Sequence, residues 1–399
     1  MRGMKREAED SRSRAKTKNK NKTKNKTKNK TETKTEAEIE TAGISIDPRA
    51  LEVCVRCGTC RSVCPAFEVL GWESRNTRGR IMVAKALGEG LTPDASVLES
   101  LNTCTTCGIC AASCPAGANP PEIVQEARKG LVSQGIMTEA QAGFRTKVAG
   151  SGNTFGEAGE RLAWLSDAGA IKEKAEAVYF VGCLDSYRYP EVAAKTFRIL
   201  KLFGVSLLRE ERCCGSPLIR TGSSAGKVME ENLRQIREMG AKTVVTGCAG
   251  CLSTLKRYYP PEFEVVSVPE FLAGRLSELG PRRLDLTVTY HDPCHLGRHA
   301  GVYDPPRNVI KAICRLVEMN RSREDARCCG GGGGVRAGYP DLSLQIAKLR
   351  LQDVPDGVDA IVSCCPLCIR NLSDAGAGAG AGIEVIDLID LVARAIDPA

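Results

Sequence analysis

The sequence predicts a small, mainly helical α+β domain followed by two tandem α/β modules that are related by pseudo-twofold symmetry. A short cysteine pattern occurs twice near the N-terminal end, and a longer one occurs twice in the rest of the chain, where β-branched runs alternate with amphipathic stretches. The 399 residues are enough for two or three domains with separate cores. We expect a basic tail at residues 1–44, the helical domain at 45–130, a helical connector at 131–176, a first module at 177–280 and a second module at 281–399.

The basic tail holds the excess charge of the chain. Residues 1–36 carry 14 Lys and Arg against 5 Asp and Glu, a net of +9, whereas the whole chain is +8, so residues 37–399 sum to −1. A lysine-rich, low-complexity segment with almost nothing apolar predicts disorder. The alternative is a docking arm for acidic lipid, nucleic acid or an acidic partner subunit. No aromatic residue interleaves with the lysines, so nucleic acid is not expected as a partner.

Cysteine is the unusual residue of this chain, with twenty copies against three histidines. The N-terminal residues include no apolar core of a signal peptide, which predicts a cytoplasmic protein. Disulfides are rare in that compartment, so closely spaced cysteines are expected to bind metal or to carry out redox chemistry. No run of 18 apolar residues is present, and we therefore expect contact with the inner face of a membrane only through a partner subunit.

The short pattern predicts two iron–sulfur clusters. "CVRCGTCRSVCP" and "CTTCGICAASCP" share the C-x2-C-x2-C-x3-C-P spacing of bacterial ferredoxins, in which the fourth cysteine binds the neighbouring cluster. The prediction is an α+β, ferredoxin-like helical dicluster domain with two cubane [4Fe-4S] clusters. The first cluster would take Cys54, Cys57, Cys60 and Cys114, and the second Cys104, Cys107, Cys110 and Cys64. Structural zinc is the alternative, but it needs one closed set of four ligands and not two interlocked sets.

The longer pattern places a lone cysteine, a double cysteine and a C-x2-C pair in each module. These are Cys183, Cys213, Cys214, Cys248 and Cys251 in the first module and Cys294, Cys328, Cys329, Cys365 and Cys368 in the second. They fall just after short β-branched runs, and parallel sheets place ligands at the carboxyl ends of their strands. Two like modules in one chain predict two sites that face each other.

Each module offers five thiolates, one more than a cubane cluster uses. A double cysteine projects two sulfurs from one turn and so can bridge irons. The five glycines that follow Cys329 would let the backbone approach a cluster and donate N–H groups to its sulfurs.

These residues carry a resemblance to a known family. The two modules behind a dicluster domain, and above all "YHDPCHLGRHAGVYDPPR" and "CCGGGGGVRAGYPDLSLQIAKLR", resemble the D-type catalytic subunit of heterodisulfide reductase. The resemblance covers nearly the whole chain after about residue 45. It implies that each module, here called a CCG module, binds a noncubane [4Fe-4S] cluster, so that one or two such clusters are expected. It implies a catalytic role for the ten module cysteines in reducing the coenzyme M–coenzyme B heterodisulfide, a small disulfide substrate, to two thiols.

The same resemblance leaves the electron donor and one alternative function open. The donor would be another subunit, either a b-type cytochrome of the membrane or a flavoprotein. Iron–sulfur subunits of glycolate, lactate and glycerol-3-phosphate dehydrogenases share the architecture, and "SRNTRGRI" is similar to them. In that case the chain would only transfer electrons for a flavin-dependent dehydrogenase.

Five further residues receive interpretations from their setting. His291, His295 and His299 are four apart but lie at a strand-to-helix turn, where we weigh capping and packing against a proton-supplying role beside a cluster. Cys314 lies on an apolar helical stretch and is expected to be a buried thiol. Cys364 precedes Cys365 and could replace it as a ligand, but the register with the first module favours Cys365.

Overall fold

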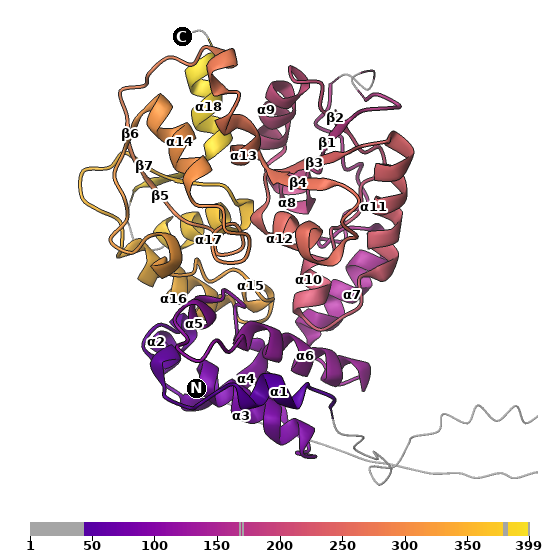
Figure 1. Ribbon diagram of the computed structural model, residues 1–399, viewed down its shortest axis with the longest axis vertical. Helices are drawn as coiled ribbons and strands as arrows, with labels where there is room; N and C mark the ends of the chain where they lie inside the picture. The colour runs from indigo at the N-terminus through magenta and orange to yellow at the C-terminus, as the bar shows by residue number, and fades with distance from the viewer. Residues whose placement is uncertain (1–43, 167–168, 170, 378–381, 398–399) are drawn as a thin grey trace, which may run out of the picture. The chain divides into compact units, whose positions relative to one another are not determined.

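The computed structural model describes residues 44–166, 169, 171–377 and 382–397 (Figure 1). The predicted basic tail, except for Ile44, lies outside these residues.

The N-terminal part of the described chain is helical. Its elements are α1 (Pro48–Glu52), η1 (Thr59–Arg61), α2 (Pro65–Leu70), η2 (Glu73–Arg75), α3 (Thr77–Gly88), α4 (Ala95–Asn102), α5 (Ile109–Ala112), α6 (Pro120–Ser133) and α7 (Glu139–Ser151). Asn76 caps α3 by accepting a hydrogen bond from Gly79 N at 3.1 Å. Ile81, Leu101 and Leu131 join a small apolar core between α3, α4 and α6. Among the described residues before Ala177 there is no strand.

The first module is a four-stranded parallel sheet with the order β2-β1-β3-β4. The strands are β1 (Ala177–Tyr179), β2 (Ser206–Leu207), β3 (Thr243–Thr246) and β4 (Glu264–Ser267). The helices are α8 (Cys183–Arg188), α9 (Pro190–Lys201), α10 (Ser216–Arg220), α11 (Gly226–Met239), α12 (Ala249–Tyr258), α13 (Val268–Ala273) and η4 (Leu276–Leu279). β-Branched runs such as "TVVT" in β3 suit a parallel sheet, because its strands are buried on both faces.

The second module repeats this topology with the order β6-β5-β7-β8, again all parallel. The strands are β5 (Thr287–Tyr290), β6 (Arg315–Leu316), β7 (Ala360–Ser363) and β8 (Glu384–Asp387). The helices are α14 (Asp304–Ile313), η5 (Arg323–Asp325), α15 (Val335–Gly338), α16 (Pro340–Leu351), α17 (Pro366–Ala377) and α18 (Leu388–Ile396). The prediction of two small parallel α/β modules is therefore confirmed.

One apolar core runs through both modules. It includes Val178 and Val244 from the first sheet and Val288 and Val362 from the second, all fully buried. Helix α13 packs against α14, and α9 packs against α18, so that helices of different modules meet (Figure 1). Burial of this shared apolar surface holds the two modules together.

The helical part is tied to both modules by the fully buried Arg128 of α6. Its Nη1 donates to Arg220 O at 2.6 Å in the first module and to Gly333 O at 3.0 Å in the second. Its Nη2 donates to Leu101 O at 2.6 Å and to Cys104 O at 2.8 Å. Burial of a guanidinium is costly unless its donors are paired, and the bonds from Nη1 and Nη2 to these four carbonyls fix three segments relative to one another.

Candidate functional site

The cysteines of the modules lie where strands end. Cys183 begins α8 shortly after β1, and Cys248 follows β3. In the second module Cys294 follows β5 and Cys365 follows β7. Because the strands of each sheet are parallel, these positions share one edge, as the sequence predicted.

The five thiols of the first module form one connected group. Side-chain contacts link Cys183 to Cys213, Cys213 to Cys214, Cys214 to Cys251 and Cys251 to Cys248. The hydrogen bonds from Cys213 and Cys251 lower the pKa of Cys214 to about 6. The hydrogen bond with Cys213, together with burial, raises the pKa of Cys183. The pKa is therefore lowered at Cys214 and Cys248 and raised at Cys183, Cys213 and Cys251.

The five thiols of the second module form a matching group. Side-chain contacts link Cys294 to Cys328, Cys328 to Cys329, Cys329 to Cys368 and Cys368 to Cys365. The hydrogen bonds from Cys328 and Cys368 lower the pKa of Cys329. All five are buried. The second cysteine of each double pair is therefore the one whose environment favours the thiolate.

The two groups touch each other. Cys248 of the first module lies against Cys365 of the second, and this contact, after that of Cys251, lowers the pKa of Cys248. The second group also touches the helical part, because Cys107 lies against Cys328. A continuous series of sulfur contacts therefore runs from the helical part through the second module to the first.

The eight cysteines of the helical part surround two small cavities. One is lined by Cys54, Cys57, Cys60 and Cys114, and the other by Cys64, Cys104 and Cys107, while Cys110 lines both. These are the two crossed sets predicted from the spacing, with Cys110 in the wall between them. Cys57 is exposed, the single exposed one among the twenty cysteines.

The glycine run after Cys329 has two tasks. Gly330 N donates to Cys328 Sγ at 3.3 Å, and in the first module Gly215 N donates to Cys213 Sγ at 3.5 Å, as expected for glycines beside sulfur sites. The sequence did not predict the second task. A Cβ at Gly332 would lie 2.6 Å from Thr105 O, and one at Gly333 would lie 2.3 Å from Cys104 O. These glycines let the second module pack on the helical part.

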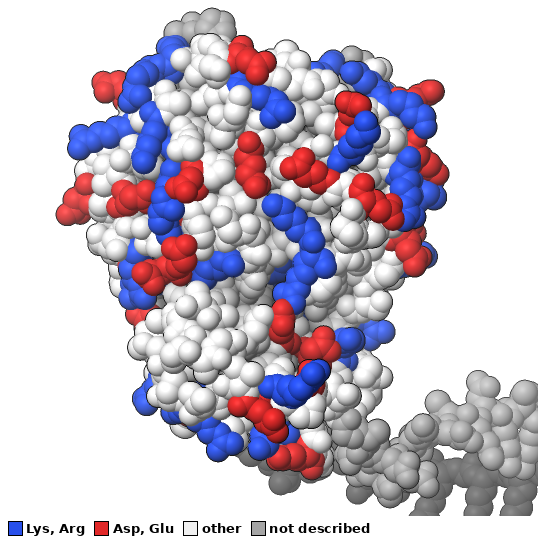
Figure 2. Space-filling view, viewed as in Figure 1, with Lys and Arg blue, Asp and Glu red and all other residues white. Residues whose placement is uncertain are grey.

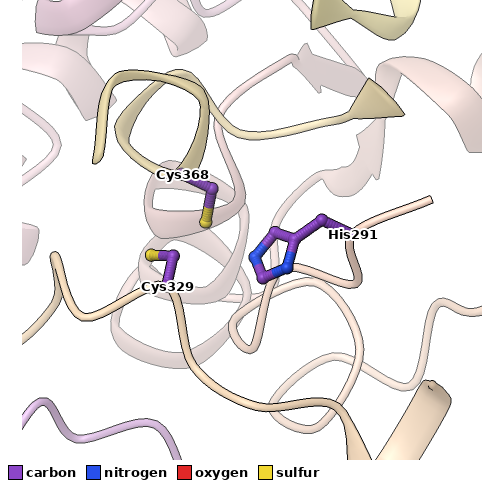
Figure 3. A group of neighbouring side chains, drawn as sticks. All are labelled: His291, Cys329 and Cys368. Atoms are coloured by element: carbon purple, nitrogen blue, oxygen red, sulfur yellow. The ribbon is translucent and has the colours of Figure 1, made fainter. Parts of the chain in front are cut away.

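His291 lies beside two sulfurs of the second module. A ring nitrogen of His291 and the Sγ atoms of Cys329 and Cys368 lie within 4.8 Å of one another (Figure 3). Its Nδ1 accepts a hydrogen bond from Arg350 Nε at 3.0 Å, and burial lowers the pKa of the imidazole. The sequence could not identify Arg350, which lies 59 residues further along the chain.

The other two histidines stack face to face, with ring centroids 4.4 Å apart. His295 Nδ1 lies 3.2 Å from Cys294 Sγ, and burial lowers the pKa of His295. His299 Nε2 lies 2.9 Å from Thr106 O, and burial lowers its pKa to about 4. Two of the three histidines therefore contact a sulfur group, and His299 joins the second module to the helical part.

The first module has a different neighbour at its lone cysteine. Arg161, from the predicted connector, places Nη2 3.4 Å from Cys183 Sγ and Nη1 2.9 Å from Glu211 Oε1. Glu211 accepts hydrogen bonds from Val181 N at 2.7 Å and Gly182 N at 2.9 Å. Both partners are nearly fully buried, so a permanent cation is held against the first sulfur group. No sequence pattern marked Arg161 as part of a site.

Two cysteines lie outside the sulfur groups. Cys314 is 1% exposed, and burial raises its pKa, in agreement with a buried thiol. Cys364 is buried beside Tyr290, and burial raises the pKa of its thiol. Cys365, and not Cys364, interacts with Cys368, so Cys365 stays the proposed ligand.

The donor set fits iron–sulfur clusters. Eighteen thiols in compact groups offer the soft ligands that iron–sulfur clusters take, and backbone N–H groups donate to three of the sulfurs. Gly182 allows close approach as well, because a Cβ there would lie 3.2 Å from Cys251 Sγ.

The surface carries mixed charge. Figure 2 shows basic and acidic side chains interspersed over the visible face. No helix in the described part of the chain is both long and apolar enough to cross a membrane.

Comparison with known proteins agrees with these groups. Residues 50–118 match the model of a 4Fe-4S dicluster domain, and residues 177–256 and 288–373 match that of a cysteine-rich domain, CCG. The chain is 37% identical over 384 residues to the D-type subunit of the dihydromethanophenazine:CoB–CoM heterodisulfide reductase of Methanosarcina acetivorans, covering 87% of this chain and 94% of that protein. It is 37% identical to the B-type subunit of the CoM/CoB fumarate reductase of Methanothermobacter marburgensis, over 54% of this chain and 45% of that one. It is 32% identical to the EtfAB:quinone oxidoreductase of Syntrophomonas wolfei, over 69% and 44%.

The match to the heterodisulfide reductase protein spans almost the full length of both chains and includes the helical part and both modules. The chain therefore belongs to the family of D-type heterodisulfide reductase subunits, which are iron–sulfur oxidoreductases with a 4Fe-4S dicluster domain and CCG modules.

Proposed function

We propose that this chain is the catalytic subunit of a heterodisulfide reductase. It would reduce the mixed disulfide of coenzyme M and coenzyme B to two thiols, with electrons relayed through two cubane clusters. The reaction breaks one S–S bond and consumes two electrons and two protons, so that each sulfur leaves as a thiol.

The contact between Cys248 and Cys365 carries this proposal. A disulfide presents two bonded sulfurs and takes up a pair of electrons when it is cleaved. Two sulfur-rich groups that meet at one point match such a substrate. Simple electron transfer to a partner needs no second group of the same kind facing the first.

We propose the ligands as follows. One cubane [4Fe-4S] cluster is held by Cys54, Cys57, Cys60 and Cys114, and the other by Cys104, Cys107, Cys110 and Cys64; the two CCG groups hold one or two noncubane [4Fe-4S] clusters. When bound, the clusters supply electrons one at a time. The two lined cavities support the crossed sets. The proposed domains keep the boundaries 45–130, 131–176, 177–280 and 281–399, with pseudo-twofold symmetry between the modules.

Protein groups also supply the protons. His295 is buried, touches Cys294 through Nδ1, and its Nε2 has no hydrogen-bond partner in the described chain. Because burial keeps this imidazole neutral, it would act as a relay that takes up a proton at Nε2 as it gives the Nδ1 proton to a thiolate that forms beside it. The second module is thus equipped for the protonation of a product.

Electrons would enter at the exposed Cys57 side of the helical part. The donor is proposed to be a partner subunit, either a membrane-bound b-type cytochrome or a flavoprotein. Contact with the inner face of a membrane would come through that partner, and the chain itself would be cytoplasmic.

The test is reduction of the coenzyme M–coenzyme B disulfide by the anaerobically purified, iron-loaded chain with reduced viologen as the donor. We expect two thiols per disulfide consumed. Absence of turnover by loaded protein, combined with normal electron transfer from a flavoprotein partner, would favour the dehydrogenase-subunit alternative. The similarity to a protein named EtfAB:quinone oxidoreductase is the observation that supports this alternative.

A further inference from the structure

We infer that His291 is a hydrogen-bond donor, through Nε2–H, to the sulfurs of the second module and is not a ligand to iron. The inference rests on the proposed function only in that a cluster occupies the second module. The grouping of His291 with Cys329 and Cys368 would by itself suggest that His291 is a metal ligand, and the inference gives it a different role.

The tautomer of His291 follows from its neighbour. Arg350 Nε lies 3.0 Å from Nδ1, and a guanidinium is always a donor and never an acceptor. Nδ1 must therefore carry the lone pair, and in the neutral ring the proton resides on Nε2. A neutral histidine that bound iron through Nε2 would need its proton on Nδ1, where it would meet the N–H of Arg350.

Arg350 is itself held in place. Its side chain is 0% exposed, and Nη1 donates to Asp353 Oδ2 at 2.9 Å and to Arg321 O at 2.6 Å. A buried cation with these partners does not leave its site without a large cost in free energy. The tautomer of His291 is thus fixed by a rigid neighbour, and Arg350 acts as a positioning residue.

The free edge of the ring faces the sulfurs. Nε2 is buried and has no hydrogen-bond partner among the described residues. His291 as a whole is 1% exposed, so that water does not supply the missing partner from bulk solvent. In Figure 3 the edge of the ring that bears Nε2 points toward Cys329 and Cys368. A buried N–H donor aimed at two sulfurs is satisfied when sulfur of the loaded site accepts from it.

The first module provides an internal comparison. Phe180 occupies the position of His291, because Phe180 N donates to Val245 O and His291 N donates to Val362 O in the corresponding strands. Each residue also lies three positions before the lone cysteine of its module. The histidine is therefore not required for five thiols to gather, and its role is specific to the second module.

A donated N–H stabilises the extra negative charge of a reduced cluster, so it raises the reduction potential. We expect His291→Phe, which copies the first module, to retain its iron and to shift the second-module signal to a more negative midpoint potential in an EPR-monitored redox titration. That signal is identified by its loss in Cys329→Ser. His291→Gln, which can still donate an N–H, should restore part of the shift, and the first-module signal should not move.

A measurement on the unmodified protein makes the test independent of folding of the variants. Protein labelled with ¹⁵N-histidine should show, by pulsed EPR, a weak ¹⁵N coupling on the second-module signal. A strong coupling, typical of a nitrogen bound to iron, would overturn the inference, and so would an unchanged midpoint potential in iron-loaded His291→Phe. If the wild-type chain holds no cluster in the second module, it is the proposed function that fails.

Discussion

The thiol of Cys248 in the first module interacts directly with the thiol of Cys365 in the second, so the two sulfur groups meet across the module interface. Both residues are the first cysteine of a C-x2-C pair at the end of the third strand of their modules in chain order. Equivalent positions of two repeated folds therefore touch each other. The proposal of a substrate with two bonded sulfurs rests on this relationship.

The first prediction concerns the double cysteines. Cys214→Ser and Cys329→Ser should each reduce viologen-driven heterodisulfide turnover by at least roughly a hundredfold, because a hydroxyl is a poor ligand for soft iron. The EPR signals of both dicluster centres should persist. Cys314→Ser is the matched control, since Cys314 is buried outside the groups and should leave turnover intact. Full activity in either double-cysteine variant would contradict the proposed ligands.

The second prediction concerns the crossed ligands. Cys114→Ser should damage the cluster built on Cys54, Cys57 and Cys60, because Cys114 lines their cavity. Cys64→Ser should damage the other cluster, whose cavity it lines. Iron content and EPR of the two variants check this. The assignment would be wrong if each variant lost the cluster nearest to it in sequence.

The third prediction concerns the buried ion pair at the first module. Arg161→Met leaves the Glu211 carboxylate buried without its cation, which should lower the free energy of unfolding by roughly 3–5 kcal/mol. The double variant Arg161→Met/Glu211→Gln removes both charges but keeps only one of the two oxygens that accept from Val181 N and Gly182 N, so it should recover part of that loss. Anaerobic denaturant unfolding of the single and double variants measures the difference. Equal losses in the two would show that Glu211 does not depend on Arg161.

The fourth prediction concerns pH. Burial raises the pKa of Asp387 to about 7, from an ordinary value of 3.8. The folded state therefore binds the proton more tightly than the unfolded chain, and the stabilisation is complete below about pH 4 and lost as the pH rises through about 7. Asp387→Asn stays neutral and can still accept from Ile389 N, which Asp387 Oδ1 does at 2.8 Å. We expect the melting temperature of Asp387→Asn to rise relative to that of the wild type as the pH increases from about 5 to about 8.

Asp94→Asn is the matched control for that prediction. Asp94 also caps a helix, by accepting from Val97 N at 3.0 Å, and this hydrogen bond lowers its pKa. A lowered pKa contributes stability above the unfolded value that is lost as the pH falls. The melting temperature of Asp94→Asn should therefore fall relative to that of the wild type as the pH rises from about 3 to about 5. Equal pH profiles for the two variants would contradict the raised pKa of Asp387.

The sequence by itself determined the local features of this protein. The spacing of cysteines placed five in each module and eight in the helical part, because a sulfur pattern on one turn or strand end depends on neighbouring residues alone. The β-branched runs and amphipathic stretches determined two parallel sheets, since burial on both faces imposes a local composition. The sequence alone also showed that the segments containing the histidines and the glycine run resemble one family.

Only the tertiary structure decided which groups meet. Three contacts join residues that are far apart in sequence. Cys107 contacts Cys328, Arg161 lies beside Cys183, and Arg350 donates a hydrogen bond to His291. No periodicity or spacing records such pairs, because they arise from packing between elements that could meet in several ways. The same packing gave Gly332 and Gly333 their second task, since a Cβ there would collide with Thr105 and Cys104 of another segment. The charged and polar side chains that surround the sulfur groups are thus brought there by the packing of the whole fold.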